Sequence, residues 1–304
     1  EMPSDDIKKV REMIAGLPPR TGMSIPERRA TMDAWDKAYP VADDVTVASA
    51  KVAEVPVEWI TAPNASEDAV LLFLHGGGYV IGSPDSHRHL VANLSEETGL
   101  QGLLVDYRLA PEDPFPAAVE DAISVYAALL THGFEAEEIV VAGDSAGGGL
   151  VVALMLAIRD ANLPLPAAGI CLSPWNDLTG TAKSLETNAS VDPTVTKESL
   201  DFFAGEYLGE EDAQNPYASP LFGDFTGLPP LLIQVGSVEV LLDDAVMLAE
   251  RAKEAGVSVT LEVWDEMIHV WHRYYPVLQE AREANARIGE YVRGIVSVNA
   301  AAAE

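Results

Sequence analysis

Apolar runs and amphipathic segments alternate along the chain from residue 69 onward. The runs at 69–75, 101–107 and 138–142 are mostly apolar, which is typical of strands buried on both faces. The segments between them repeat apolar residues every three or four positions and predict helices. This alternation predicts an α/β fold with a mostly parallel sheet between helices. The expected strands lie at 69–75, 101–107, 138–142, 167–172, 231–235 and 257–264, and the expected helices at 86–98, 116–132, 146–162, 243–255 and 276–296.

Three regions do not follow this alternation. Residues 45–50 and 51–60 are typical of a hairpin ahead of the sheet. Residues 1–40 predict two amphipathic helices. The segment 177–229, with a helix near 197–208, is a long insertion between two strands, and such insertions are usually functional. We expect it to cover the open end of the sheet as a cap. The two N-terminal helices have apolar faces formed by Ile7, Val10, Ile14 and Leu17, and by Met32, Trp35 and Tyr39.

Composition narrows the function classes. With 304 residues, 48% of them hydrophobic, the chain can bury a large core. Its 48 acidic and 19 basic residues give a net charge of −29, which disfavours nucleic acid and anionic membranes as partners. No apolar run reaches the length of a membrane span, and the N-terminus has no signal-peptide pattern. The single cysteine, Cys171, excludes a disulfide framework and fits a cytoplasmic location.

A serine lies between glycines, directly after an expected strand and before an expected helix. The motif is Gly143-Asp144-Ser145-Ala146-Gly147, a G-x-S-x-G pattern. A sharp turn from strand to helix brings backbones close together, and flanking glycines avoid side-chain collisions there. Such a turn exposes the serine hydroxyl in front of the positive end of the helix dipole. An ordinary helix N-cap is the alternative, and a phosphate-binding loop is disfavoured because no G-K-[ST] follows.

A serine hydroxyl is a weak nucleophile and needs a base. Of the six histidines, His269 and His272 follow the strand expected at 257–264. A loop after that strand lies at the same end of the sheet as Ser145. We predict His269 as the base because it comes sooner after the strand, with His272 as the alternative.

The base in turn needs a carboxylate that fixes its tautomer and stabilises the imidazolium. In this motif the chain order is nucleophile, acid, base, so the acid should follow a strand between residues 145 and 269. Glu239 lies in the loop after the strand expected at 231–235. Asp243 and Asp244 open the next helix, where capping and the helix dipole explain them without catalysis. We predict Glu239 as the acid, with Asp243 as the alternative.

A run of glycines supplies candidate donors to an oxyanion. His75-Gly76-Gly77-Gly78 ends the strand expected at 69–75. Consecutive glycines let backbone N–H groups approach a substrate oxygen with no side chain in the way. The N–H of Ala146, directly after the serine, would complete the donor set. A flexible turn is the alternative interpretation of the glycines.

Together these motifs resemble the bacterial hormone-sensitive lipase family of α/β-hydrolases. The similarity extends over nearly the whole chain and is carried by HGGG at 75–78, DYRLAPE at 106–112, GDSAGGG at 143–149 and the acid and histidine loops. It implies hydrolysis of short-acyl carboxylic esters beneath a helical cap. It also implies Ser145 as nucleophile, His269 as base, and Gly77, Gly78 and Ala146 as oxyanion donors. One departure is Glu239, where family members often carry aspartate.

We therefore expect a carboxylesterase of α/β-hydrolase fold that acts on a small-molecule ester through an acyl-enzyme. Residues 1–40 and 177–229 form the expected cap, and 41–176 and 230–304 the catalytic domain. No metal or cofactor is expected, and a homodimer is one option for the oligomeric state. An amidase or thioesterase using the same site, and a non-catalytic binding protein of this fold, are the alternatives.

Overall fold

The central sheet has eight strands in the order β1-β2-β4-β3-β5-β6-β7-β8. The computed structural model describes residues 3–18, 22–34 and 38–297. From β3 to β8 neighbouring strands are parallel, whereas β1 and β2 form an antiparallel hairpin that joins the sheet at β4. The strands are β1 (Thr46–Val52), β2 (Val55–Thr61), β3 (Ser66–Leu74), β4 (Leu100–Val105), β5 (Ile139–Asp144), β6 (Ala168–Leu172), β7 (Leu231–Gly236) and β8 (Val259–Trp264).

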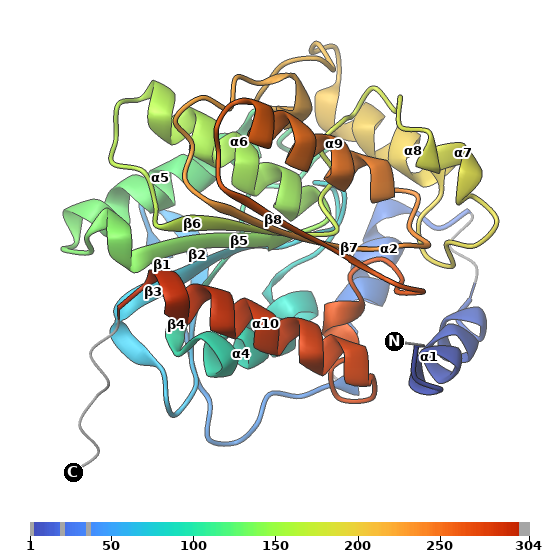
Figure 1. Cartoon of the computed structure of the whole chain (residues 1–304), viewed down its shortest axis with the longest axis horizontal. Helices are drawn as coiled ribbons and strands as arrows, with labels where there is room; N and C mark the ends of the chain where they lie inside the picture. The colour runs from blue at the N-terminus through green and yellow to red at the C-terminus, as the bar shows by residue number, and fades with distance from the viewer. Residues whose placement is uncertain (1–2, 19–21, 35–37, 298–304) are drawn as a thin grey trace.

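Helices cover both faces of this sheet, as the alternating pattern predicted. Figure 1 shows α5, α6 and α9 on one face, and α4 and α10 on the other. Two apolar clusters fill the spaces between these helices and the sheet. Apart from the exposed start of β3, the strands β3 to β7 are therefore buried on both sides, which explains their mostly apolar sequence. The five helices are α4 (Pro84–Thr98), α5 (Ala117–Thr131), α6 (Ala146–Asp160), α9 (Leu242–Glu254) and α10 (Gln279–Ile295).

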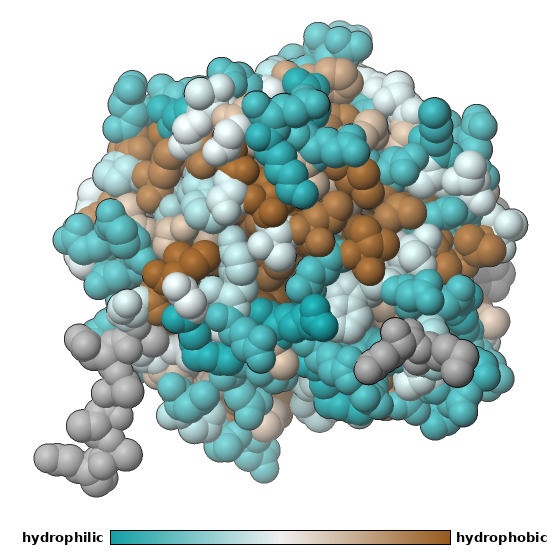
Figure 2. Space-filling view, in the orientation of Figure 1, coloured by the Kyte–Doolittle hydropathy of each residue, from teal (hydrophilic) through white to brown (hydrophobic). Residues whose placement is uncertain are grey.

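The expected elements from residue 69 onward are confirmed, with ends that shift by three residues or fewer. The last helix begins at Gln279 rather than 276, because a 3-10 turn, η3 (Trp271–Tyr274), comes shortly before it. Pro116 precedes α5 instead of occupying its first position. The edge strand β8 is partly exposed, and Val263 in it is 48% exposed. Figure 2 shows apolar patches among the hydrophilic side chains on one face of the molecule.

Within the described residues, four short helices gather beyond one end of the sheet, on the right of Figure 1. Arg28 lies 5.1 Å from the ring centroid of Phe202, so the helix of residues 25–33 contacts the helix of residues 197–208. Ile7 and Val10 are buried as predicted, but Leu17 lies beyond the end of its helix and is 47% exposed. Trp35 lies outside the described residues. The four helices are α1 (Asp6–Ala15), α2 (Ile25–Asp33), α7 (Ser184–Thr187) and α8 (Lys197–Leu208).

Candidate active site

Ser145 occupies a strained turn between β5 and α6. Its backbone has φ 54° and ψ −121°, a conformation that costs energy for a residue with a side chain. The flanking glycines are in close backbone contact. A Cβ at Gly143 would lie 2.4 Å from the carbonyl oxygen of Gly147, and one at Gly147 would lie 2.0 Å from that of Leu74. The collision expected for larger residues at these two positions is therefore present in the structure.

Three of the residues singled out in the sequence form one chain of hydrogen bonds. Oγ of Ser145 lies 2.9 Å from Nε2 of His269, and Nδ1 of His269 lies 2.8 Å from Oε2 of Glu239. The side chain of Glu239 is fully buried, and that of His269 is 11% exposed. A carboxylate can only accept, so Nδ1–H donates to Glu239 and Nε2 is free to accept the serine proton.

The surroundings of His269 favour its protonated form. Burial by itself would lower the pKa of the imidazole, but the hydrogen bond and charge of Glu239 outweigh that effect and raise the pKa above its ordinary value. The site therefore stabilises a positive charge on His269 at the moment it takes a proton. This is the electrostatic condition for a general base that becomes an imidazolium.

The alternative acids bind the chain elsewhere. Asp243 accepts a hydrogen bond of 2.9 Å from the Ser184 N–H. Asp244 accepts bonds from the N–H groups of Asn176 and Asp177 at 2.7 and 3.1 Å. Both lie in the first turn of α9 as expected, but neither caps that helix: its N-cap residue is Leu241, and the Asp243 N–H donates to Oγ of Ser184 over 3.0 Å. The expected capping role is wrong, because Asp244 binds the loop after β6 and Asp243 binds the first residue of α7 instead.

The alternative base is also engaged elsewhere. Nε2 of His272 lies 2.8 Å from Oε1 of Gln234, and the side chain is fully buried. Burial lowers the pKa of His272 to about 3, so the ring is neutral. His272 is thus a buried core residue, bonded to Gln234 and not to Ser145.

Gly77 and Gly78 lie in a tightly enclosed loop after β3. Gly77 has φ 122°, and a Cβ there would lie 2.1 Å from the carbonyl oxygen of Ile81. A Cβ at Gly78 would lie 2.4 Å from the side chain of Phe203 in α8. Within the described residues the N–H groups of these two glycines donate no hydrogen bond. Ala146 is the first residue of α6, where an N–H has no acceptor within the helix.

The sequence did not reveal a buried link between this loop and the serine turn. Oδ1 of Asp144 accepts a 2.9 Å hydrogen bond from the Gly76 N–H and lies 3.1 Å from Nε2 of His87. Burial alone would raise the pKa of Asp144, but the charge and hydrogen bond of His87 lower it to about 2. Asp144 stands in the serine motif, yet no local pattern pairs it with a histidine 57 positions away.

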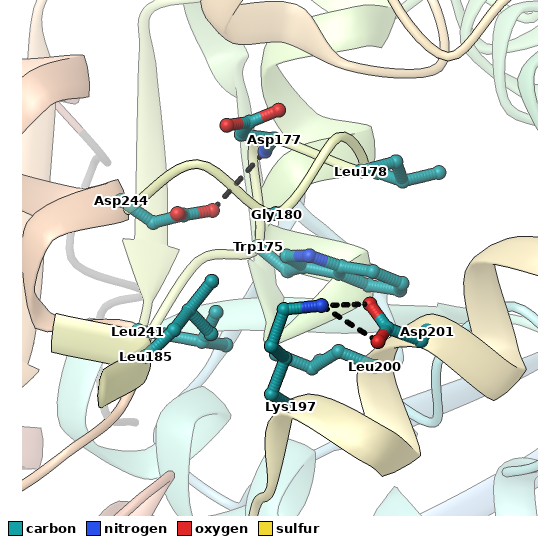
Figure 3. A pocket seen from close by; sticks show the side chains of 10 residues that line it. All are labelled: Trp175, Asp177, Leu178, Gly180, Leu185, Lys197, Leu200, Asp201, Leu241 and Asp244. Atoms are coloured by element: carbon teal, nitrogen blue, oxygen red, sulfur yellow. Dashed lines mark hydrogen bonds and ion pairs between the residues drawn. The ribbon is translucent and has the colours of Figure 1, made fainter. Parts of the chain in front are cut away.

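A small cavity of ≈ 10 Å³ lies beside α7 and α8, with space for about one water molecule. Figure 3 shows the ion pair between Lys197 and Asp201, 2.7 Å long, beside the indole of Trp175. Burial raises the pKa of Asp244, on the cavity wall, to about 7. None of the predicted site residues lines this cavity. Its lining residues are Trp175, Asp177, Leu178, Gly180, Leu185, Lys197, Leu200, Asp201, Leu241 and Asp244.

Other kinds of site have little support in the described residues. Among them, no three histidine, cysteine or carboxylate side chains are grouped so that they could hold a metal ion. No helix in the described ranges is long and apolar enough to cross a bilayer. The absence of a cofactor stays a prediction.

Comparison with known proteins assigns the family. Residues 71–273 match the family model for the alpha/beta hydrolase fold. The crystal structure of an esterase from the bacterial hormone-sensitive lipase family superposes with a TM-score of 0.94 at 48% identity, covering 98% of this chain and all of that one. The chain belongs to this family. The resemblance inferred from the motifs is confirmed, and so is the α/β-hydrolase fold.

Two other relatives are similar over almost their whole length. An acetyl-hydrolase from Streptomyces hygroscopicus is 45% identical over 298 residues, which cover 96% of this chain and 97% of the relative. The structure of EstE5 soaked with p-nitrophenyl butyrate has a TM-score of 0.93 at 44% identity, covering 97% of this chain and all of EstE5. The similarity therefore includes the helices at the end of the sheet as well as the sheet itself.

Proposed function

We propose that this family member hydrolyses carboxylic esters with Ser145 as nucleophile, His269 as base and Glu239 as acid. The observation that carries the proposal is the continuous hydrogen-bond chain through these three side chains. Ser145 Oγ attacks the ester carbonyl while Nε2 of His269 takes its proton. Glu239 holds the imidazole in the required tautomer and offsets its positive charge. The chain is a carboxylic-ester hydrolase, as esterases among its relatives indicate.

The tetrahedral intermediate places a negative charge on the former carbonyl oxygen. The N–H groups of Gly77, Gly78 and Ala146 are the proposed donors to this oxyanion. Neither glycine N–H group has a partner in the part of the chain that the structure describes, which supports this assignment, because a donor already engaged would have to break a bond first. The imidazolium of His269 then gives its proton to the leaving alcohol. Water repeats the sequence on the acyl-enzyme and releases the acid.

Short acyl groups are the proposed substrates. The relatives' names point to acetyl and butyryl esters, and the side chain of Phe203 in α8 packs directly on Gly78 of the oxyanion loop. Residues 1–40 and 177–229 then form the cap over the catalytic domain of 41–176 and 230–304. A cap held this close to the reacting carbonyl limits the space for long chains. A small ester is the partner of this site, and a cytoplasmic location and a homodimer belong to the proposal as well.

Matched ester, amide and thioester substrates with the same short acyl group test this function. The expected result is efficient turnover of the ester, far slower turnover of the amide, and loss of all turnover in Ser145→Ala. Preferential hydrolysis of the amide or thioester would favour the alternative enzyme classes. Absence of turnover on every substrate, together with tight ligand binding, would favour the non-catalytic binding protein.

A further inference from the structure

We propose that Ser173 is a positioning residue that locks the acid and base loops into one unit, an inference that rests on the proposed function. Ser173 directly follows β6 and is fully buried. Its Oγ donates to Oε1 of Glu239 over 2.7 Å and accepts the N–H of Val270 over 3.1 Å. One hydroxyl thus joins the residue after β6 to the acid after β7 and to the residue next to His269.

The carboxylate of Glu239 depends on this arrangement for its orientation. Oε1 accepts from Ser173 and, over 2.6 Å, from the Gly236 N–H, which leaves Oε2 to face His269. Glutamate has one more rotatable bond than aspartate and so more orientations to lose. Two donors on Oε1 select the orientation that places Oε2 against Nδ1. Ser173 is therefore the side-chain donor of the two groups that hold the Glu239 carboxylate facing His269.

The loop that carries His269 depends on the same hydroxyl. Val270 has φ 50°, an unfavourable conformation for a β-branched residue, and its N–H is held by Ser173. The two loops are also in direct backbone contact, since a Cβ at Gly236 would lie 2.0 Å from the carbonyl oxygen of Met267. A shift of one loop is thus transmitted to the other, and Ser173 is the side chain that bonds to both.

Ser173→Ala tests this role, and the chain provides a matched control. Ser95 is equally buried, donates to the Leu100 carbonyl over 2.7 Å and accepts from the Ala62 N–H over 3.1 Å. Neither of these hydrogen bonds involves the loops of Glu239 or His269. Ser173→Gly is the second variant. Ser173 has φ 46°, which glycine adopts freely, so this variant separates loss of the hydroxyl from backbone strain.

Two measurements report on positioning rather than stability. We expect kcat of Ser173→Ala and Ser173→Gly to fall about tenfold to a hundredfold with KM changed less than about twofold, because a hydrogen bond to a charged group is lost. The low-field proton NMR signal of His269 Nδ1–H should broaden or shift in both variants. Ser95→Ala should keep the wild-type kcat and signal.

Several results would overturn the inference. These are an unchanged kcat in either Ser173 variant, a lower kcat with an unchanged Nδ1–H signal, or an equal loss of kcat in Ser95→Ala. The Ser145→Ala variant distinguishes failure of the positioning role from failure of the proposed function. If Ser145→Ala is inactive and Ser173→Gly is fully active, only the positioning role is wrong; if Ser145→Ala is active, the triad itself is wrong.

Discussion

Nε2 of His269 lies 2.9 Å from Oγ of Ser145, although 124 positions separate the two residues in the chain. Each residue follows a different parallel strand, Ser145 after β5 and His269 after β8. Because the carboxyl ends of parallel strands meet at one edge of the sheet, two loops distant in sequence face each other there. The fold itself therefore brings the serine and the histidine together.

The pH dependence of kcat/KM should report His269. The base must be neutral to accept a proton, and its pKa is raised, so activity should fall as the pH drops through a value above the ordinary 6.5. Glu239→Gln removes the charge that raises this pKa and leaves the burial that lowers it. We expect the acid limb to move to lower pH, while kcat drops by roughly 10³ to 10⁴. Asp243→Asn, the matched carboxylate change, should leave the acid limb in place. If the limb moves in Asp243→Asn and not in Glu239→Gln, the assignment of Glu239 as the acid is wrong.

Asp244 should make stability depend on pH. Burial raises its folded-state pKa from 3.8 to about 7, so between these values the folded chain binds a proton that the unfolded chain releases. Stability from this group is therefore lost as the pH rises from about 4 to about 7, by up to about 4 kcal/mol. Asn at this position is neutral at every pH and still accepts from Asn176 and Asp177. The difference in thermal midpoint, Asp244→Asn minus wild type, should increase from pH 5 to pH 8; a constant or decreasing difference would contradict the raised pKa.

The N-terminal helix should be needed for activity as well as for stability. Val10 is 1% exposed and packs in an apolar cluster with Val238, next to Glu239, and with Met267 and Ile268, just before His269. Val10→Ala should cost about 2 kcal/mol of unfolding free energy through lost burial and a cavity. Deletion of residues 1–40 should abolish or severely reduce turnover. Lys9→Ala, on an exposed position of the same helix, serves as the control. A folded deletion variant with wild-type kcat would show that α1 does not support the two loops.

Phe203 should set the acyl-length preference. Its side chain contacts Gly78, so its removal opens space next to a proposed oxyanion donor. We expect the wild-type kcat/KM to peak at short acyl chains and fall steeply for long ones. In Phe203→Ala the peak should move to longer acyl chains. While space remains, each added CH₂ should increase kcat/KM by up to about fourfold. Phe202→Ala is the matched control, because that ring is 36% exposed and lies beneath Arg28. An identical length profile in all three proteins would exclude Phe203 from the acyl site.

The residues of the candidate site can be predicted from the sequence where they leave a local pattern. Ser145 is marked by its glycines, and Glu239 and His269 by their places after strands, in the chain order that the motif requires. Ser173 carries no such mark, because its importance lies in bonds to residues 66 and 97 positions away. The same holds for Asn188, which donates to the Glu239 carbonyl over 2.8 Å, and for His87 beside Asp144. Contacts between side chains from distant segments depend on how the loops pack, and hydrophobic periodicity contains no information about that packing.

The central claim is that Ser145 is the nucleophile, and covalent labelling tests it most directly. An alkyl fluorophosphonate should react with the intact protein to one adduct per chain, and peptide mass spectrometry should locate the phosphonyl group on Ser145. Ester hydrolysis should be lost in proportion to labelling, and Ser145→Ala and His269→Ala should remain unlabelled. Labelling of a different serine, or full hydrolytic activity in a chain whose Ser145 is completely labelled, would contradict the account.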